Sequence, residues 1–266
     1  MGSHIHRMKC GELRHDLCME PEISVIVPVL NEANCLAATL ESVANQNTNV
    51  PWELVVSDSG STDGSFDIAK RYTDRVICCE ERGIGAGRHF GAVNASNSSR
   101  YFIFIDADTV IPGYYLAYVY ETFKTDPGLV AFSTGFEFSE QSEQIKLAEA
   151  VANKYFLMRD KLLSVTLPGF NTCVRRDAYE ECGGYRNVLL EDVDFSRRVH
   201  KIGDVKFFPH IKVMNSSRRL ESMGLLGTVY YYAQLDLGGK LDSTFIDRLA
   251  QKLRVADMRE YVGIRK

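Results

Sequence analysis

Two acidic residues one position apart, Asp106 and Asp108, directly follow the apolar run Tyr101–Ile105. A run of this length that is rich in aromatic and β-branched residues predicts a buried strand. Two carboxylates side by side at the end of such a strand repel each other unless a cation or a strongly polar ligand neutralises them. Hard ions such as Mg²⁺ or Mn²⁺ bind oxygen ligands and keep open positions for nucleotide phosphates. The pattern favours a divalent-metal site, and capping of the following helix is the alternative.

Polar residues follow three of the predicted strands, at 28–32, 58–63 and 106–108. In open α/β sheets, ligands bind in the crevice outside the carboxyl ends of the strands. We therefore expect the three segments to line one crevice. Within the second segment, Asp58 can accept a hydrogen bond from the imide N–H of uracil or the amide edge of guanine. Its alternative role is that of a turn residue.

Short apolar runs alternate with amphipathic segments from Ile23 onward, which is the pattern of β-α-β units around a largely parallel sheet. We expect strands at 23–29, 52–57, 75–79, 101–105, 130–138 and 170–174, with edge strands at 205–208 and 211–213. Helices are expected after Asn34, at 63–72, 113–125, 143–163 and 192–201, and near Asp177, while 83–91 reads as a loop turning into a helix. The predicted fold class is α/β, with one domain and a mostly parallel mixed sheet flanked by helices.

Four motifs occur in order: VPVLNE at 27–32, VVSDSGSTD at 55–63, DAD at 106–108 and ED at 191–192. Together they resemble family 2 glycosyltransferases of the GT-A fold, over residues 23–219. One departure is Ser57, where the family often has a second Asp, but the carboxylate of Asp58 is retained. The resemblance implies a Rossmann-like sheet with a nucleotide-binding lobe and an acceptor lobe.

The resemblance also implies nucleotide-sugar contacts, for which the matched residues are Pro28, Glu32, Asp58, Asp106, Ala107 and Asp108. The first three would hold the nucleoside. Asp106 would face the ribose and metal-bound water, and Asp108 would coordinate the Mn²⁺ or Mg²⁺ that bridges the two phosphates.

The ED motif supplies the candidate catalytic base. The resemblance implies that Asp192 takes a proton from the acceptor, and Glu191 is the competing candidate. A carboxylate at the start of the predicted helix is also favoured electrostatically, so simple helix capping is the alternative.

Further candidates come from basic residues and a histidine. The Gly-rich segment 83–88 lacks the Lys-Ser/Thr of a Walker loop, but Arg88 suits the donor diphosphate, with a flexible surface loop as the alternative. His210 is a candidate third metal ligand, or a packed histidine. Arg218 and Arg219 resemble a basic pair that clamps the leaving diphosphate or an acceptor phosphate, or they are a solvated surface pair.

Composition narrows the function class. The 266 residues are 45% hydrophobic with a net charge of -4, which is ample for a core and argues against nucleic acid as a partner. The seven cysteines form an odd number, and Cys78 and Cys79 are adjacent, so a disulfide framework is not expected. We therefore expect a cytoplasmic protein.

The predicted organisation has three parts. Residues 1–21 form an N-terminal tail that begins with what looks like an expression-vector scar, 22–220 the GT-A catalytic domain, and 221–266 a C-terminal helical extension. In that extension, 247–262 is amphipathic and basic, which fits peripheral contact with the inner face of a membrane, an acceptor-lobe lid or a homodimer contact.

The sequence predicts an inverting, metal-dependent glycosyltransferase that uses a UDP- or GDP-linked sugar. Inversion is implied by the resemblance, and the acceptor is a glycan, a lipid or a small molecule with a hydroxyl or phosphate group. One rival is a sugar-1-phosphate nucleotidyltransferase, which needs a Gly-rich basic loop where this chain has Pro28 to Asn31. The other is a non-catalytic nucleotide-sugar-binding protein, against which the presence of Asp192 argues.

Overall fold

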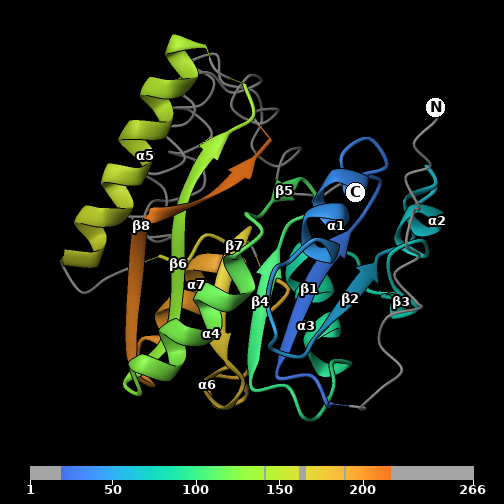
Figure 1. Ribbon diagram of the computed structural model, residues 1–266, viewed down its shortest axis with the longest axis horizontal. Helices are drawn as coiled ribbons and strands as arrows, with labels where there is room; N and C mark the ends of the chain where they lie inside the picture. Colours follow the sequence, from blue (N-terminus) through green and yellow to red (C-terminus); the bar gives the residue numbers. More distant parts are fainter. Residues whose placement is uncertain (1–18, 141, 162–165, 189, 217–266) are drawn as a thin grey trace, which may run out of the picture.

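The computed structural model describes residues 19–140, 142–161, 166–188 and 190–216. Its strands are β1 Ile23–Val29, β2 Trp52–Asp58, β3 Val76–Cys78, β4 Tyr101–Ile105, β5 Thr109–Val110, β6 Leu129–Phe138, β7 Asn171–Arg175 and β8 Asp204–Asn215. Its helices are α1 Leu36–Ala44, α2 Ser65–Ala69, α3 Ile84–Val93, α4 Tyr115–Thr125, α5 Glu143–Lys161, α6 Arg176–Glu181 and α7 Glu191–Val199. Figure 1 shows these elements around one sheet.

The described strands form one mixed sheet in the order β3-β2-β1-β4-β7-β6-β8-β5. The first four strands in this order run parallel, β7 is antiparallel to both of its neighbours, and β6 and β8 are again parallel. This confirms the predicted α/β fold class with its mixed sheet. The parallel half brings the carboxyl ends of β1, β2 and β4 to one edge, which is where ligands bind in such sheets.

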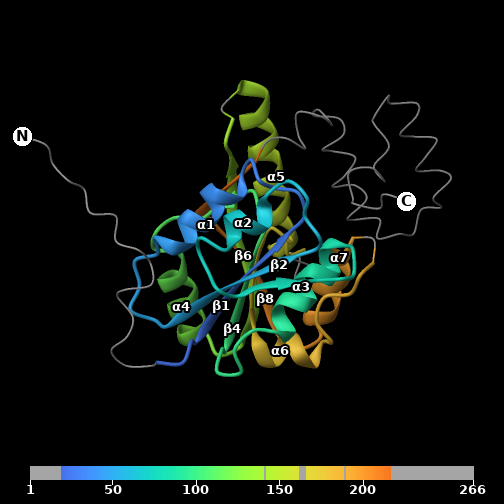
Figure 2. The same cartoon turned by 90° about the vertical axis from the view of Figure 1, so that its right-hand side faces the viewer.

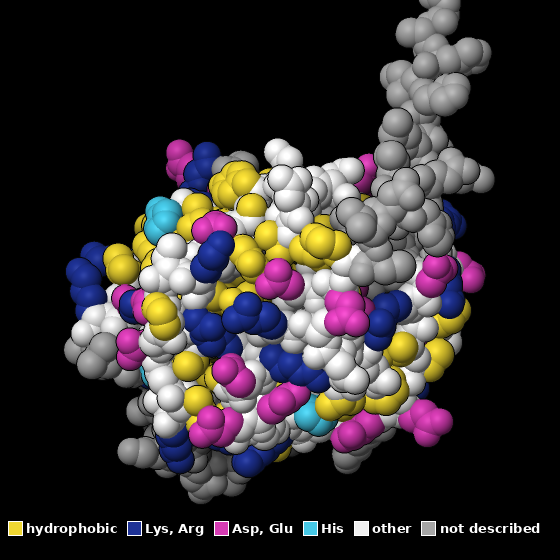
Figure 3. Space-filling model, turned by 60° about the horizontal axis from the view of Figure 1, so that its bottom comes forward, with side chains coloured by type: hydrophobic (Ala, Val, Ile, Leu, Met, Phe, Trp, Pro, Cys, Tyr) yellow, Lys and Arg dark blue, Asp and Glu magenta, His cyan; other side chains and the backbone are white. Residues whose placement is uncertain are grey.

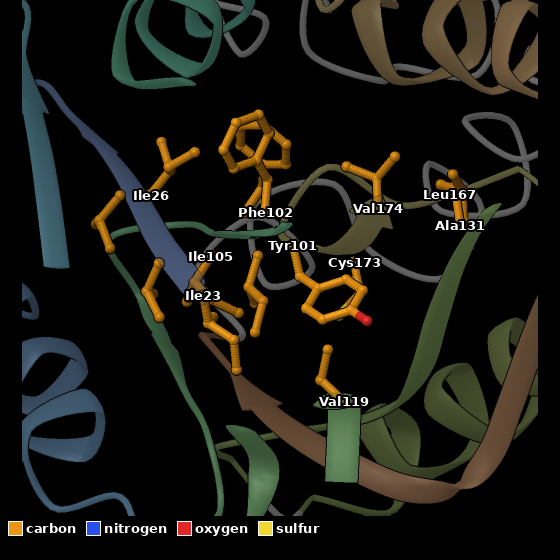
Figure 4. Packing of buried hydrophobic residues seen from close by; sticks show 14 of the residues in the cluster. Ile23, Ile26, Tyr101, Phe102, Ile105, Val119, Ala131, Leu167, Cys173 and Val174 are labelled. Atoms are coloured by element: carbon orange, nitrogen blue, oxygen red, sulfur yellow. The ribbon is translucent and has the colours of Figure 1, made fainter. Parts of the chain in front are cut away.

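Helices cover both faces of the sheet. The side chains of β4 alternate between the two faces, so each face packs against different helices. Tyr101 stacks on Phe123 of α4, with ring centroids 5.0 Å apart. Phe102 and Phe104 point to the other face and contact Tyr179 of α6. Figure 4 shows Tyr101 and Phe102 on opposite sides of the strand, and Figure 2 shows α3, α6 and α7 together on one side of the sheet. The five residues of β4 are buried, so the position of Asp106 after β4 is set by the core.

The prediction of two edge strands at 205–208 and 211–213 is wrong, since the structure has the single strand β8 there. The β6–β8 register jumps from the pair Thr134–Phe208 to the pair Gly135–Lys212. This irregularity around Pro209 accommodates the proline within one strand, as bulges do. The short strand β5 was not predicted, because two residues carry no readable periodicity.

Small residues let α3 lie close against β1. A Cβ added to Gly91 would lie 2.5 Å from Cγ2 of Ile26, which is fully buried. Gly91→Ala is therefore expected to destabilise the protein by about 1–3 kcal/mol through overpacking, as measured by chemical denaturation. Gly113→Ala is the matched control, since its added Cβ would make only an ordinary contact at 3.6 Å. Equal stabilities of the two variants would contradict this packing.

On the face drawn in Figure 3, Lys and Arg side chains lie among Asp, Glu and apolar groups rather than forming a continuous basic surface. Within the described ranges, none of the helices combines the length and the apolar character that a bilayer span requires. The predicted extension 221–266 and residues 1–18 of the predicted tail 1–21 lie outside the described residues.

Candidate active site

Hydrogen bonds join the loops that follow β1 and β2. The backbone N–H of Asn31 donates to Oγ of Ser61 at 2.9 Å, and the N–H of Thr62 donates back to Oδ1 of Asn31 at 2.8 Å. The N–H of Glu32 donates to Oγ of Ser65 at 2.9 Å. These reciprocal bonds bring two of the three predicted polar segments together at the carboxyl edge of the sheet.

Asp58 ends β2 and is only 4% exposed. Its Oδ2 accepts the backbone N–H groups of Gly60 and Ser61 at 3.1 and 3.0 Å, so the turn role holds for that oxygen. Its Oδ1 is buried and has no hydrogen-bond partner in the part of the chain that the structure describes. An unsatisfied buried acceptor is costly, and a base edge that donates a hydrogen bond would satisfy it. Pro28, near the end of the neighbouring β1, lies at the same edge.

The DAD segment turns out of the sheet directly after β4. The Thr39 hydroxyl of α1 donates to the carbonyl of Ala107 at 2.8 Å and fixes the middle of the segment. The side chains of Asp106 and Asp108 are both partly exposed. The next helix, α4, has Tyr114 as its N-cap. The two aspartates therefore do not cap it, and that alternative is wrong.

Arg88 lies at the centre of the site, on α3. It is 1% exposed, its Nη2 donates to Oδ1 of Asp106 at 2.6 Å, and its Nη1 donates to Oε1 of Glu191 at 2.6 Å. The alternative of a flexible surface loop is wrong, because the residue is a buried part of a helix. The guanidinium is enclosed and paired with two carboxylates, and its contact with the donor diphosphate stays a prediction.

Two neighbours that the sequence did not point to enclose this guanidinium. The ring of Tyr185 lies 5.2 Å from Cζ of Arg88, within cation–π range. A Cβ on Gly169 would overlap the guanidinium, so only glycine fits there. The run of small residues around Arg88 could have predicted this enclosure, because a helix rich in glycine and alanine packs closely against its neighbours.

Glu191 and Asp192 begin α7, and each is 8% exposed. Oδ1 of Asp192 accepts the N–H of Val193 at 2.8 Å, while the N-cap position belongs to Leu190. Burial, followed by the charge of Glu191, raises the pKa of Asp192 to about 7, and the charge of Arg88 opposes this rise. A carboxylate with a pKa near neutrality suits general-base catalysis.

The structure does not bring His210 to these carboxylates. His210 is exposed on β8, where its Nε2 lies 3.3 Å from the hydroxyl of Tyr118. Searching the described ranges finds no group of three or more His, Cys, Asp or Glu side chains that could hold a metal, so His210 is not grouped with the two aspartates. Arg218 and Arg219 lie outside the described residues.

A hollow of about 630 Å³ lies against a different face of α3. It is lined by residues of the β3–α3 connection, of α3 and of the segment before α7: Cys78, Cys79, Glu80, Glu81, Ala86, His89, Phe90, Val93, Tyr185, Arg186 and Asn187. None of the predicted donor-binding carboxylates is among these residues. We therefore base the site on the carboxyl edge of the sheet and not on this hollow.

The donor atoms at the DAD segment fit a hard divalent cation. Arg88 holds Oδ1 of Asp106, and the second oxygen of that carboxylate and the carboxylate of Asp108 would be the ligands of a cation bound here. Two partly exposed carboxylates from adjoining positions suit Mg²⁺ or Mn²⁺, which complete their coordination with water or phosphate oxygens.

A mixed sheet with acidic segments at the carboxyl ends of its parallel strands, and a buried carboxylate pair opposite them, defines a GT-A type fold. Residues 24–183 match the sequence model described as Glycosyl transferase family 2. The chain therefore belongs to glycosyl transferase family 2.

Curated relatives agree with this membership. Glycosyltransferase GlyA of Streptococcus pneumoniae serotype 4 is 30% identical over 145 residues, which cover 53% of this chain and 20% of GlyA. Glycosyltransferase AglE of Haloferax volcanii is 26% identical over 201 residues, which cover 71% of this chain and 65% of AglE. The chain thus spans less than two thirds of the length of either relative.

Solved structures support the fold. S. aureus TarS 1–349 in complex with UDP-GlcNAc superposes with a TM-score of 0.60 at 18% identity, covering 87% of this chain and 71% of TarS 1–349. Mannosyltransferase PcManGT of Pyrobaculum calidifontis, in complex with GDP-Man and Mn²⁺, gives a TM-score of 0.60 at 21% identity, covering 81% of this chain and 65% of PcManGT.

Proposed function

We propose that this chain transfers a sugar, with inversion, from a UDP- or GDP-linked donor to a hydroxyl or phosphate acceptor with the help of a divalent cation. One observation carries the proposal: Arg88 joins Asp106, on the donor side, to Glu191, next to the candidate base, through two 2.6 Å ion pairs. The carboxylates that we assign to donor binding and to proton transfer are thus held close to one another, as a transfer reaction requires.

The residues divide the chemistry between them. Asp58 and the linked loops after β1 and β2 hold the base and ribose of the donor. Asp192 takes the proton of the acceptor hydroxyl, whose oxygen attacks the anomeric carbon. The bond from that carbon to the phosphate oxygen breaks, and the nucleoside diphosphate leaves with the bonding electron pair. Asp106 and Asp108 would hold a divalent cation, which when bound would supply Lewis-acid stabilisation of the charge on the leaving diphosphate.

The donors and the metal are also supported by the fold neighbours. TarS 1–349 binds UDP-GlcNAc, and PcManGT binds GDP-Man with Mn²⁺. A carboxylate at the position of Asp58 accepts hydrogen bonds only, so it suits the N–H of uracil or guanine. Residues 22–220 form the proposed catalytic unit.

Both rival functions have a specific weakness. A sugar-1-phosphate nucleotidyltransferase would release pyrophosphate, and the segment after β1 lacks its Gly-rich basic loop. A non-catalytic nucleotide-sugar-binding protein would not need the buried carboxylate of Asp192, whose raised pKa equips it as a base. Incubation of the chain with candidate donors, Mn²⁺ and acceptor mixtures, followed by product analysis, separates the three. Release of a nucleoside diphosphate with a glycosylated product supports the proposal, and release of pyrophosphate or of nothing contradicts it.

Asp58→Asn tests the base contact. Asparagine keeps an oxygen for the N–H groups of Gly60 and Ser61, so the turn is retained, but the charge-assisted hydrogen bond to the base is lost. We expect affinity for UDP or GDP to fall about tenfold or more, since hydrogen bonds to charged groups are worth about 1.5–3 kcal/mol. Isothermal titration measures the change, and Asp67→Asn, at an exposed position of α2, is the control. Equal affinities of the two variants would remove Asp58 from the donor site.

A further inference from the structure

Three elements far apart in the sequence converge on one buried guanidinium. Arg88 comes from α3, Asp106 follows β4, and Glu191 begins α7. The side chain of Arg88 is 2% exposed, and those of Asp106 and Glu191 are 13% and 11% exposed. We propose that Arg88 is a positioning residue, which holds the donor-side carboxylate of Asp106 and the first turn of α7, and thereby Asp192, in one fixed arrangement. The inference rests on the proposed function, because it assigns Arg88 a part in that reaction.

The enclosure of Arg88 argues against direct contact with a phosphate. Gly169 lies against the guanidinium with no room for a Cβ, and the ring of Tyr185 covers another side. The two Nη atoms already donate to carboxylates at 2.6 Å. Arg88 therefore acts through Asp106 and Glu191 rather than on the donor itself.

The backbone at the start of α7 needs such a tether. Leu190 has a φ of 56°, in the left-handed region that a residue with a branched side chain rarely adopts. Strained backbone of this kind persists where the surrounding contacts determine it, and it is found often at functional sites. Glu191, which follows Leu190 directly, forms the ion pair with Arg88. This ion pair therefore fixes the direction in which α7, with Asp192, leaves the turn.

The charge balance shows why the bridge requires arginine. One positive charge interacts with the carboxylates of Asp106, Glu191 and Asp192, and the planar guanidinium can donate in two directions at once. A lysine carries the same charge but no rigid fork, so it cannot hold both carboxylates at their present separation. Replacement by lysine thus separates positioning from charge.

Kinetics of Arg88→Lys and Arg176→Lys form the first test. Arg176 is the control because it forms an ion pair of the same 2.6 Å length, with Glu180 in α6. We expect Arg88→Lys to lower kcat of sugar transfer about 10- to 100-fold, which is the usual effect of losing a residue that orients the groups in contact with the ligand. KM for the donor is expected to change less than threefold. The control is expected to stay within twofold of the wild type. A rise in KM with an unchanged kcat would overturn the inference in favour of direct phosphate contact, and so would wild-type values of both.

Hydrogen exchange gives a second readout that does not depend on activity. The amides of Val193 and Asp194 bond to the carbonyl of Leu190, and in Arg88→Lys they are expected to exchange at least tenfold faster than in the wild type. Unchanged exchange would overturn the inference even if transfer is slow. Absence of transfer by the wild type would instead refute the proposed function, and the exchange result would still decide whether Arg88 holds α7. Should Arg88→Lys fail to fold, Glu191→Gln, which weakens one arm of the bridge, takes its place in the exchange measurement alone, because Glu191 is also the competing candidate base and its kcat would not report positioning.

Discussion

Asp192→Asn is expected to lower kcat of sugar transfer by about 10²- to 10⁴-fold, which is the usual contribution of a positioned general base. Asparagine is nearly isosteric and can still accept the N–H of Val193, so the start of α7 is preserved. The affinity for the nucleoside diphosphate is expected to stay near the wild-type value, because Asp192 acts on the acceptor. Steady-state kinetics with a saturating donor measure the effect.

A control for this variant lies two residues further along α7. Asp194→Asn changes a carboxylate of the same helix that pairs with Arg198 and not with the site, and we expect kcat within a few-fold of the wild type. Full turnover in Asp192→Asn, with loss of turnover in Glu191→Gln, would identify Glu191 as the base instead.

Asp192→Asn should also increase the free energy of unfolding, and only at high pH. Because the pKa of Asp192 is raised in the folded protein to about 7, the native state holds a proton that the unfolded chain has released between about pH 4 and pH 7. This group therefore costs stability as the pH rises through that window. Asp192→Asn removes the cost, which is on the order of 4 kcal/mol for a full shift of this size. The gain in the free energy of unfolding should appear at pH 8 and be absent at pH 4, and an equal effect at both would contradict the buried environment of Asp192.

Asp108→Asn is expected to lower kcat/KM by about 10³-fold. The loss of a cation that stabilises the leaving diphosphate removes several kcal/mol of transition-state stabilisation, and each 1.36 kcal/mol is a factor of ten in rate. The dependence of nucleoside diphosphate binding on Mn²⁺ should disappear in the same variant, as measured by titration with and without the ion.

The control for this effect is Asp204→Asn, at an exposed position at the start of β8. We expect wild-type kinetics and an unchanged response to Mn²⁺. An Asp108→Asn variant that keeps both its turnover and its metal response would place the cation elsewhere.

Strand positions were predictable where burial leaves a clear trace in the sequence. The apolar run of β4 and the aspartates after it could be read directly, because a central strand covered on both faces needs apolar residues throughout. The loops after β1 and β2 were predicted to meet, since parallel strands carry their carboxyl ends to one edge. Their hydrogen bonds through Asn31 and Ser65 confirm the meeting.

The bridge at Arg88 could not be predicted in the same way. An arginine within a short amphipathic stretch is normally exposed, and no local pattern shows that two carboxylates will approach it from residues 18 and 103 positions away. The single strand β8 was missed for a related reason. A proline such as Pro209 normally predicts the end of a strand, but here it lies within a strand whose register against β6 is irregular at that point. Both are properties of packing between distant segments.

The most direct test of the account is a crystal structure of the full chain with Mn²⁺ and UDP or GDP, recorded at the manganese absorption edge. The account predicts an anomalous peak between the carboxylates of the DAD segment and the diphosphate, with the base beside Asp58. A nucleotide bound away from these residues, or a peak at any other group of ligands, would contradict it.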